Sequence, residues 1–180
     1  MIHDNTASFE NIYGSLLDYV NLNSLTGACH STSAVIYILF SELGLHPNLK
    51  IGEVYSYSAK ACFDHSWVEM DDEIFDIAIG YPQPPELGGQ YVCGPVFNSF
   101  DLSTGEVADI CYRYQTSSGL AEPALSVSKW TLQEYNSNEK TTIDIWKLAV
   151  LIGSHCNMHL QYESLAEKYG NTFRDLIVIE

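Results

Sequence analysis

The sequence predicts an α+β domain in which a central helix beginning at Cys29 packs on an antiparallel β-sheet. Residues 34–40 are apolar on every face, which is typical of a helix that is surrounded by protein. Residues 50–79 then hold three strand-like stretches, and residues 130–180 return to helical spacing. A run of strands followed by a run of helices is the pattern of an α+β fold.

The length of the chain favours one domain. With 180 residues, we assign residues 1–180 to a single domain, with a core at about residues 21–80 and a C-terminal helical part at about residues 130–180. A hydrophobic content of 46% is typical of a globular protein. No run of about 18 apolar residues occurs, and the first residues lack the pattern of a secretory signal, so we expect neither a membrane span nor secretion.

Charge and cysteine content narrow the class of protein. Eight basic residues against 23 acidic ones give a formal net charge of −15, which argues against nucleic-acid or anionic-membrane partners and permits a cationic one. The five cysteines are odd in number and irregular in spacing, and no CxxC occurs. We therefore expect free thiols, a cytoplasmic location and no structural zinc site.

Two helices are predicted first. The first spans Phe9 to Val20, with Asn5 or Thr6 as its cap, because apolar residues recur there at i, i+3, i+4, i+7 and i+8. The second spans residues 29–43, and Gly44 suits the left-handed position that follows a helix. A buried strand over residues 35–40 is the competing interpretation, which the length and the Gly44 stop disfavour.

The rest of the chain divides into strands, loops and C-terminal helices. Strands are predicted at residues 50–58, 65–70, 73–79 and 107–114, and loops rich in turn-forming residues at 81–94 and 116–128. Thr141 or Thr142 can cap a helix from Ile143, and a last helix stops at Gly170.

Cys29, His65 and Asp76 are the candidate catalytic residues. A thiol at a helix N-terminus feels the positive end of the helix dipole, which favours the thiolate. A thiolate nucleophile needs a base, and the base needs an orienting group. If residues 65–70 and 73–79 form a hairpin, Asp76 lies opposite or diagonal to His65 on one face, with Cβ atoms about 5–8 Å apart. Ile77 and Ile79 then point to the other face.

The order of these motifs resembles the transglutaminase-like superfamily over about residues 27–80. The resemblance is carried by Gly27-x-Cys29, Glu42-Leu43-Gly44, Ile51-Gly52-Glu53-Val54, His65-Ser66-Trp67-Val68-Glu69 and Asp76. It implies a papain-like, transglutaminase-like fold with Cys29 as nucleophile, His65 as general base and acid, and Asp76 as orienting residue. Many members have an aromatic residue where this chain has His30, and Pro soon after the Asp, where it has Ile77-Ala78.

The implied reaction is attack by the Cys29 thiolate on an amide or ester carbonyl. The resulting thioester is resolved by water or by an amine, so the substrate is a peptide, a protein or a small amide or ester, and no cofactor is implied. The Cys29 backbone N–H is the natural oxyanion donor, and Asn23 is a candidate side-chain donor unless it only shapes its loop. The alternative function is a non-catalytic, partner-binding domain of the same fold.

Three other features of the sequence are weaker candidates for a functional role. His155, His159 and Glu163 have the i, i+4, i+8 spacing of one helix face, which can bind a metal, although a packed or solvated face is the favoured interpretation. His30 is read as a neighbour at the start of the helix rather than a second base, and Asp64 as a charge at the end of a strand.

Overall fold

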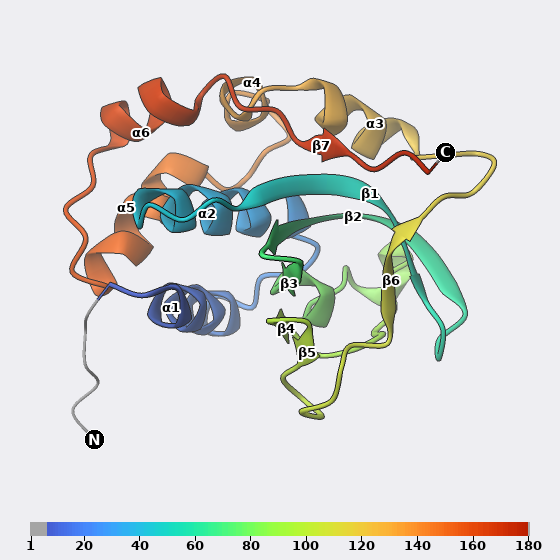
Figure 1. Cartoon of the computed structure of the whole chain (residues 1–180). Helices are drawn as coiled ribbons and strands as arrows, with labels where there is room; N and C mark the ends of the chain where they lie inside the picture. Colours follow the sequence, from blue (N-terminus) through green and yellow to red (C-terminus); the bar gives the residue numbers. More distant parts are fainter. Residues whose placement is uncertain (1–6, 180) are drawn as a thin grey trace.

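The computed structural model describes residues 7–179 and has a mixed α+β architecture, which confirms the predicted class. Figure 1 shows α1, α2 and α5 grouped beside a curled sheet, with α3 and α4 above the sheet and α6 at the upper left, above α5. The six described helices are α1 (Phe9–Leu22), α2 (Cys29–Glu42), α3 (Glu122–Lys129), α4 (Leu132–Asn136), α5 (Ile145–His155) and α6 (Tyr162–Tyr169).

The main sheet is antiparallel except at one short edge strand. Its order is β3 (Glu73–Phe75), β2 (Ala61–Met70), β1 (Asn48–Ser56) and β6 (Ile110–Tyr114), and β7 (Asp175–Leu176) pairs parallel with β1. A second sheet joins β4 (Val96–Phe97) to β5 (Phe100–Asp101), and two 3-10 helices are η1 (Ala78–Gly80) and η2 (Pro85–Leu87).

The first two helices match their predicted spans. The start of α1 and the end of α2 are each fixed by a capping interaction. Ser8 caps α1 by accepting a hydrogen bond from the Asn11 N–H at 3.2 Å, whereas Asn5 and Thr6 lie outside the described residues. At the end of α2, Gly44 has φ +79°, and the N–H groups of Gly44 and Leu45 donate to the carbonyls of Ser41 and Phe40. This is the Schellman arrangement, and it excludes the alternative of a strand.

The β2–β3 hairpin differs from the prediction after Phe75. Its turn lies at Asp71–Asp72, and Val68 pairs with Phe75. The predicted strand over residues 73–79 is wrong beyond this point, because Asp76 pairs instead with Val96 of β4 and the chain then enters η1. Ile77 and Ile79 are both buried, but in two different cores rather than on one strand face.

The C-terminal helices also correct the sequence reading. Residues 122–129 form α3 where a loop was predicted, and Asp144, not Thr141 or Thr142, caps α5. Helix α5 ends at His155, and α6 begins only at Tyr162. The expected helix face of His155, His159 and Glu163 therefore does not form, and no group of three metal-ligating side chains occurs within residues 7–179.

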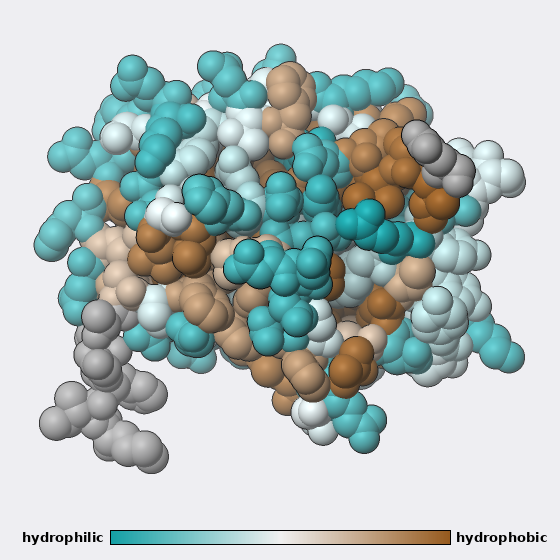
Figure 2. Space-filling view, in the orientation of Figure 1, coloured by the Kyte–Doolittle hydropathy of each residue, from teal (hydrophilic) through white to brown (hydrophobic). Residues whose placement is uncertain are grey.

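Two hydrophobic cores hold the molecule together. The larger one is shared by α1, α2, α5, α6 and one face of the sheet, so the C-terminal helices and the Cys29 helix are packed against one another. The smaller one lies on the other face and holds Val54, Trp67, Ile79, Cys93, Val96 and Tyr112. Figure 2 shows a hydrophobic patch near the C-terminus, where Leu176, Val178 and Ile179 are exposed. None of the helices in residues 7–179 could cross a bilayer.

Candidate active site

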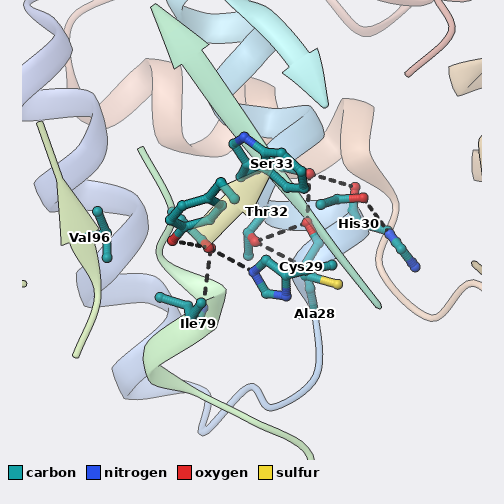
Figure 3. Close-up of polar contacts among 12 residues, drawn as sticks. Ala28, Cys29, His30, Thr32, Ser33, Ile79 and Val96 are labelled. Carbon is teal, nitrogen blue, oxygen red and sulfur yellow. Dashed lines mark hydrogen bonds and ion pairs between the residues drawn. The ribbon is translucent and has the colours of Figure 1, made fainter. Parts of the chain in front are cut away.

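The first turn of α2 places Cys29 at the wall of a cleft. Cys29 is the first helical residue and is half-buried. The hydroxyl of Thr32 donates to the Ala28 carbonyl at 3.0 Å and that of Ser33 to the Cys29 carbonyl at 2.6 Å, as Figure 3 shows. The first backbone hydrogen bonds of α2 run from the Ser31 and Thr32 N–H groups to the Ala28 carbonyl, so the Cys29 N–H precedes them and the positive end of the helix dipole lies at the sulfur.

His65 and Asp76 form a buried ion pair. The His65 Nε2 atom lies 2.8 Å from Asp76 Oδ2, and the two residues are 5% and 3% exposed. The same oxygen accepts a hydrogen bond from the Tyr112 hydroxyl at 2.9 Å, and Oδ1 accepts the Ile79 N–H at 3.2 Å. Three donors therefore fix the carboxylate that orients the His65 ring.

The same His65 ring lines the cleft together with Cys29. Because Asp76 occupies Nε2, Nδ1 is the ring nitrogen left to interact with the sulfur. Burial alone would raise the pKa of the Cys29 thiol, but the electrostatic influence of His30 and His65 and their hydrogen bonds hold that pKa well below its usual value. Burial lowers the pKa of His65, whereas Asp76 and Cys29 raise it more strongly, to about 10. Both directions favour a thiolate–imidazolium pair at neutral pH.

The cleft around Cys29 has a volume of about 1010 Å³. Its walls come from residues 25–31, residues 61–65 of β2, the loop at 78–90, residues 121–135 and residues 138–143. The predicted loop after Tyr81 packs directly on the nucleophile segment: the Gly27 N–H donates to the Tyr81 carbonyl at 2.9 Å. Gly27 has φ +61°, and a Cβ there would collide with the Gln83 side chain, so a glycine is required.

Asn23 does not join the candidate site. It lies at the end of α1, is exposed, and donates its side-chain amide to the Tyr19 carbonyl at 2.8 Å. It is not among the residues that line the cleft, whereas Gln83 is. The Cys29 backbone N–H, at the open start of α2, keeps the place expected for an oxyanion donor.

Asp64 and His30 both line the cleft. The sequence suggested only a charge at the end of a strand for Asp64 and a neighbour at the helix start for His30. The Asp64 carboxylate lines the cleft and accepts the Ala121 N–H at 2.9 Å. The Nδ1 atom of His30 lies 2.7 Å from the hydroxyl of Ser66, the residue after His65, and His30 is one of the two histidines that lower the pKa of Cys29. Strand β2 thus meets the start of α2 through two successive side chains.

No family model, curated protein or solved structure shows significant similarity to this chain. The chemistry of the site therefore rests on its own residues. The feature that separates it from an isolated cysteine is the buried hydrogen-bonded group of His65, Asp76 and Tyr112, whose His65 ring lines the same cleft as Cys29.

Tyr112→Phe tests the outer end of this chain of contacts. Removing the hydroxyl deletes one buried hydrogen bond to the Asp76 carboxylate, so we expect the free energy of unfolding to fall by about 1.5–3 kcal/mol, the range for hydrogen bonds to charged groups. Urea denaturation measures the change. Tyr91→Phe is the matched control, because Tyr91 is 59% exposed and the same substitution there should change stability by less than about 0.5 kcal/mol. Equal effects at both tyrosines would contradict the role given to Tyr112.

Proposed function

We propose that this protein is a cysteine-dependent enzyme that transfers or hydrolyses acyl groups, with a transglutaminase-like, papain-like arrangement. Cys29 is the nucleophile, His65 the general base and acid, and Asp76 the residue that orients His65. The observation that carries the proposal is the buried His65 ring, which lines the same cleft as Cys29 and is held by the Asp76 carboxylate at 2.8 Å.

The architecture around these residues supports the same reading. The nucleophile opens a buried helix, the imidazole comes from the neighbouring strand β2, and the carboxylate follows directly on β3. This is the order of elements on which the resemblance to the transglutaminase-like superfamily rests. A geometry in which a base and its orienting group are assembled around a nucleophile is recognised by roles rather than by sequence position.

The proposed reaction has two steps. The Cys29 thiolate attacks the carbonyl carbon, and the oxyanion is held by the N–H at the start of α2. As the tetrahedral intermediate collapses, the bond to the leaving amine or alkoxide breaks and His65 gives that group its proton. Water or an amine then attacks the thioester, His65 takes its proton, and the electron pair of the breaking C–S bond returns to sulfur.

The cleft defines the range of substrates. A volume of about 1010 Å³ lies at the upper end of the range for small-molecule sites, so it has room for a peptide segment as well as for a small amide or ester. Its charged lining residues outside the candidate triad include Asp64, Glu122 and Lys140. With a net charge of −15 for the whole chain, cationic substrates are the ones that long-range attraction favours.

Trapping the acyl-enzyme tests the proposal. Incubation with p-nitrophenyl acetate should acetylate Cys29, visible by mass spectrometry of the intact protein and its peptides, and the acetyl group should then be lost to water or to an added primary amine. Cys29→Ala should show neither event. Acetylation that is spread over several cysteines, or an acetyl group that stays on Cys29 indefinitely, would favour the partner-binding domain instead.

The pH dependence of thiol reactivity gives a second prediction. The thiolate forms as pH rises through the lowered pKa of Cys29, and His65 keeps its proton until pH passes about 10. We therefore expect the alkylation rate of Cys29 by iodoacetamide to be nearly constant from about pH 7 to about pH 9. N-acetylcysteine is the reference, because the rate of a free thiol rises about tenfold per pH unit below its pKa of about 8.5. A Cys29 profile that follows this reference would contradict the thiolate–imidazolium pair.

A further inference from the structure

We propose that His30 is a second catalytic residue, whose ring Ser66 orients so that one N–H donates a hydrogen bond to the Cys29 thiolate. The role in catalysis rests on the proposed function. The hydrogen bond itself does not, because it determines the reactivity of the thiol whether or not a substrate is turned over. The site then has two imidazoles on one sulfur, one from α2 and one from β2.

The position of the His30 ring is fixed from several sides. Its Nδ1 atom lies 2.7 Å from the Ser66 hydroxyl, and Ser66 is fully buried. The ring meets the Tyr135 ring edge-on with a centroid distance of 6.3 Å, and the His30 carbonyl accepts a hydrogen bond from the buried Arg174 guanidinium at 2.7 Å. Because Ser66 occupies Nδ1, Nε2 is the ring nitrogen left to meet the sulfur.

Hydrogen-bond roles give the two imidazoles different tasks. A thiolate and a carboxylate only accept hydrogen bonds, so His65 must donate from both nitrogens and is the cation of the pair. The Ser66 hydroxyl can donate, so it can supply Nδ1 of His30 and leave the single ring proton on Nε2, facing the thiolate. His65 therefore transfers the proton during the reaction, whereas His30 only donates a hydrogen bond and keeps its proton throughout.

This division matters most when the thioester is resolved. Water or an amine attacks the carbonyl carbon, and His65 accepts the proton that the attacking group releases. The C–S bond breaks, and its electron pair forms a thiolate next to His65, which at that moment has just become positive again. The His30 N–H stabilises the same leaving thiolate without taking part in the proton transfer, so its removal should slow deacylation as well as raise the pKa of the thiol.

Three other charged or titratable groups lie near this pair, and a substitution at His30 replaces none of them. Asp64 on β2 is the anion that opposes the thiolate, and Arg174, which follows α6, is the cation that favours it. Tyr135 on α4 bonds the Ser31 hydroxyl at 2.7 Å. A shift of the Cys29 pKa in a His30 variant can therefore be assigned to the loss of the His30 ring, and the His30→Gln variant separates its N–H donor from its charge.

The test is the pH profile of Cys29 alkylation by iodoacetamide in three variants. His30→Phe keeps a flat ring but removes the donor, and should raise the pKa of Cys29 by at least about one unit, which is a tenfold lower rate below that pKa. His30→Gln keeps an N–H near the place of Nε2 and should restore most of the rate. Ser66→Ala leaves the ring in place without its orienting hydroxyl and should fall between the two.

The outcomes separate this inference from the proposed function. An unchanged profile in folded His30→Phe and Ser66→Ala would overturn the role of His30 while leaving the Cys29–His65–Asp76 proposal intact. A shifted profile in a protein that never turns over an acyl-enzyme would support the hydrogen bond from His30 and overturn the proposed acyl transfer. If His30→Phe does not fold, an unchanged profile in folded Ser66→Ala still rejects the inference. The alkylation rate of the exposed Cys62 is the internal control in every variant.

Discussion

His65→Gln should lower the rate at which iodoacetamide alkylates Cys29 at about pH 6 by about 100-fold. Without the imidazolium the thiol loses a hydrogen bond and the nearest positive charge, and its pKa moves back towards about 8.5. At pH 6 a thiol with that pKa is ionised to less than about 1%, and the greater intrinsic nucleophilicity of a more basic thiolate recovers only part of the loss. Turnover of an acyl substrate should fall at least as far.

The matched control for this variant is His46→Gln, because His46 is exposed and distant from the cleft lining. It should leave the rate unchanged. A His65→Gln protein that is folded and as reactive as His46→Gln would remove His65 from the mechanism.

Combining substitutions gives a related check on turnover. Cys29→Ala should abolish it, and adding Asp76→Asn should make the double variant no worse, since residues that act as a unit have non-additive effects.

Asp76→Ala should lower the free energy of unfolding by about 3–5 kcal/mol, the largest stability effect that we expect from one substitution in this chain. The change takes the carboxylate away from the buried His65 imidazolium and leaves the Tyr112 hydroxyl and the Ile79 N–H without their acceptor. Asp76→Asn should be milder, because an amide oxygen still accepts hydrogen bonds. Urea denaturation measures both, with Asp18→Ala on the exposed face of α1 as the control.

The sign of the pH dependence follows from the raised pKa of His65. A group whose pKa is higher in the folded state stabilises the fold fully below its unfolded pKa of about 6.5, and that stabilisation is lost as pH rises through about 10. The stability difference between wild type and Asp76→Asn should therefore be largest near pH 6 and shrink towards pH 10. A difference that grows over this range, or an Asp76→Ala protein as stable as Asp18→Ala, would show that Asp76 does not hold a charged His65.

Local patterns predicted the elements that carry the site. The apolar stretch and the Gly44 stop identified α2, and the Asp71–Asp72 turn identified the hairpin that brings His65 and Asp76 together. These signals work because each depends on neighbours within a few residues, such as helix capping, turn conformation and strand alternation. The choice of Cys29, His65 and Asp76 as candidates depends also on the order of motifs that resembles the transglutaminase-like superfamily. In the structure His65 pairs with Asp76 and lines the same cleft as Cys29.

The missed features depend on contacts between distant segments. Asp76 leaves the strand because Val96, some 20 residues later, takes its backbone hydrogen bonds, and no local pattern contains that information. Tyr112 reaches Asp76 from a strand 36 residues further on. Asn23 had a plausible separation from Cys29, but the end of α1 turns its side chain back to the Tyr19 carbonyl. Periodicity assigns a residue to a face, and only tertiary packing decides what that face meets.

The most direct test of the account is the order in which the five cysteines react. Cys62 is the more exposed residue, but partial burial of its sulfur and the nearby Glu53 raise the pKa of its thiol to about 11. Cys29 is half-buried, and its thiol has a lowered pKa. At about pH 6, with iodoacetamide below one equivalent, peptide mapping by mass spectrometry should find the label on Cys29 well before Cys62. Label that appears on Cys62 as early as on Cys29 would mean that exposure alone governs these thiols, and that Cys29 is not an activated nucleophile.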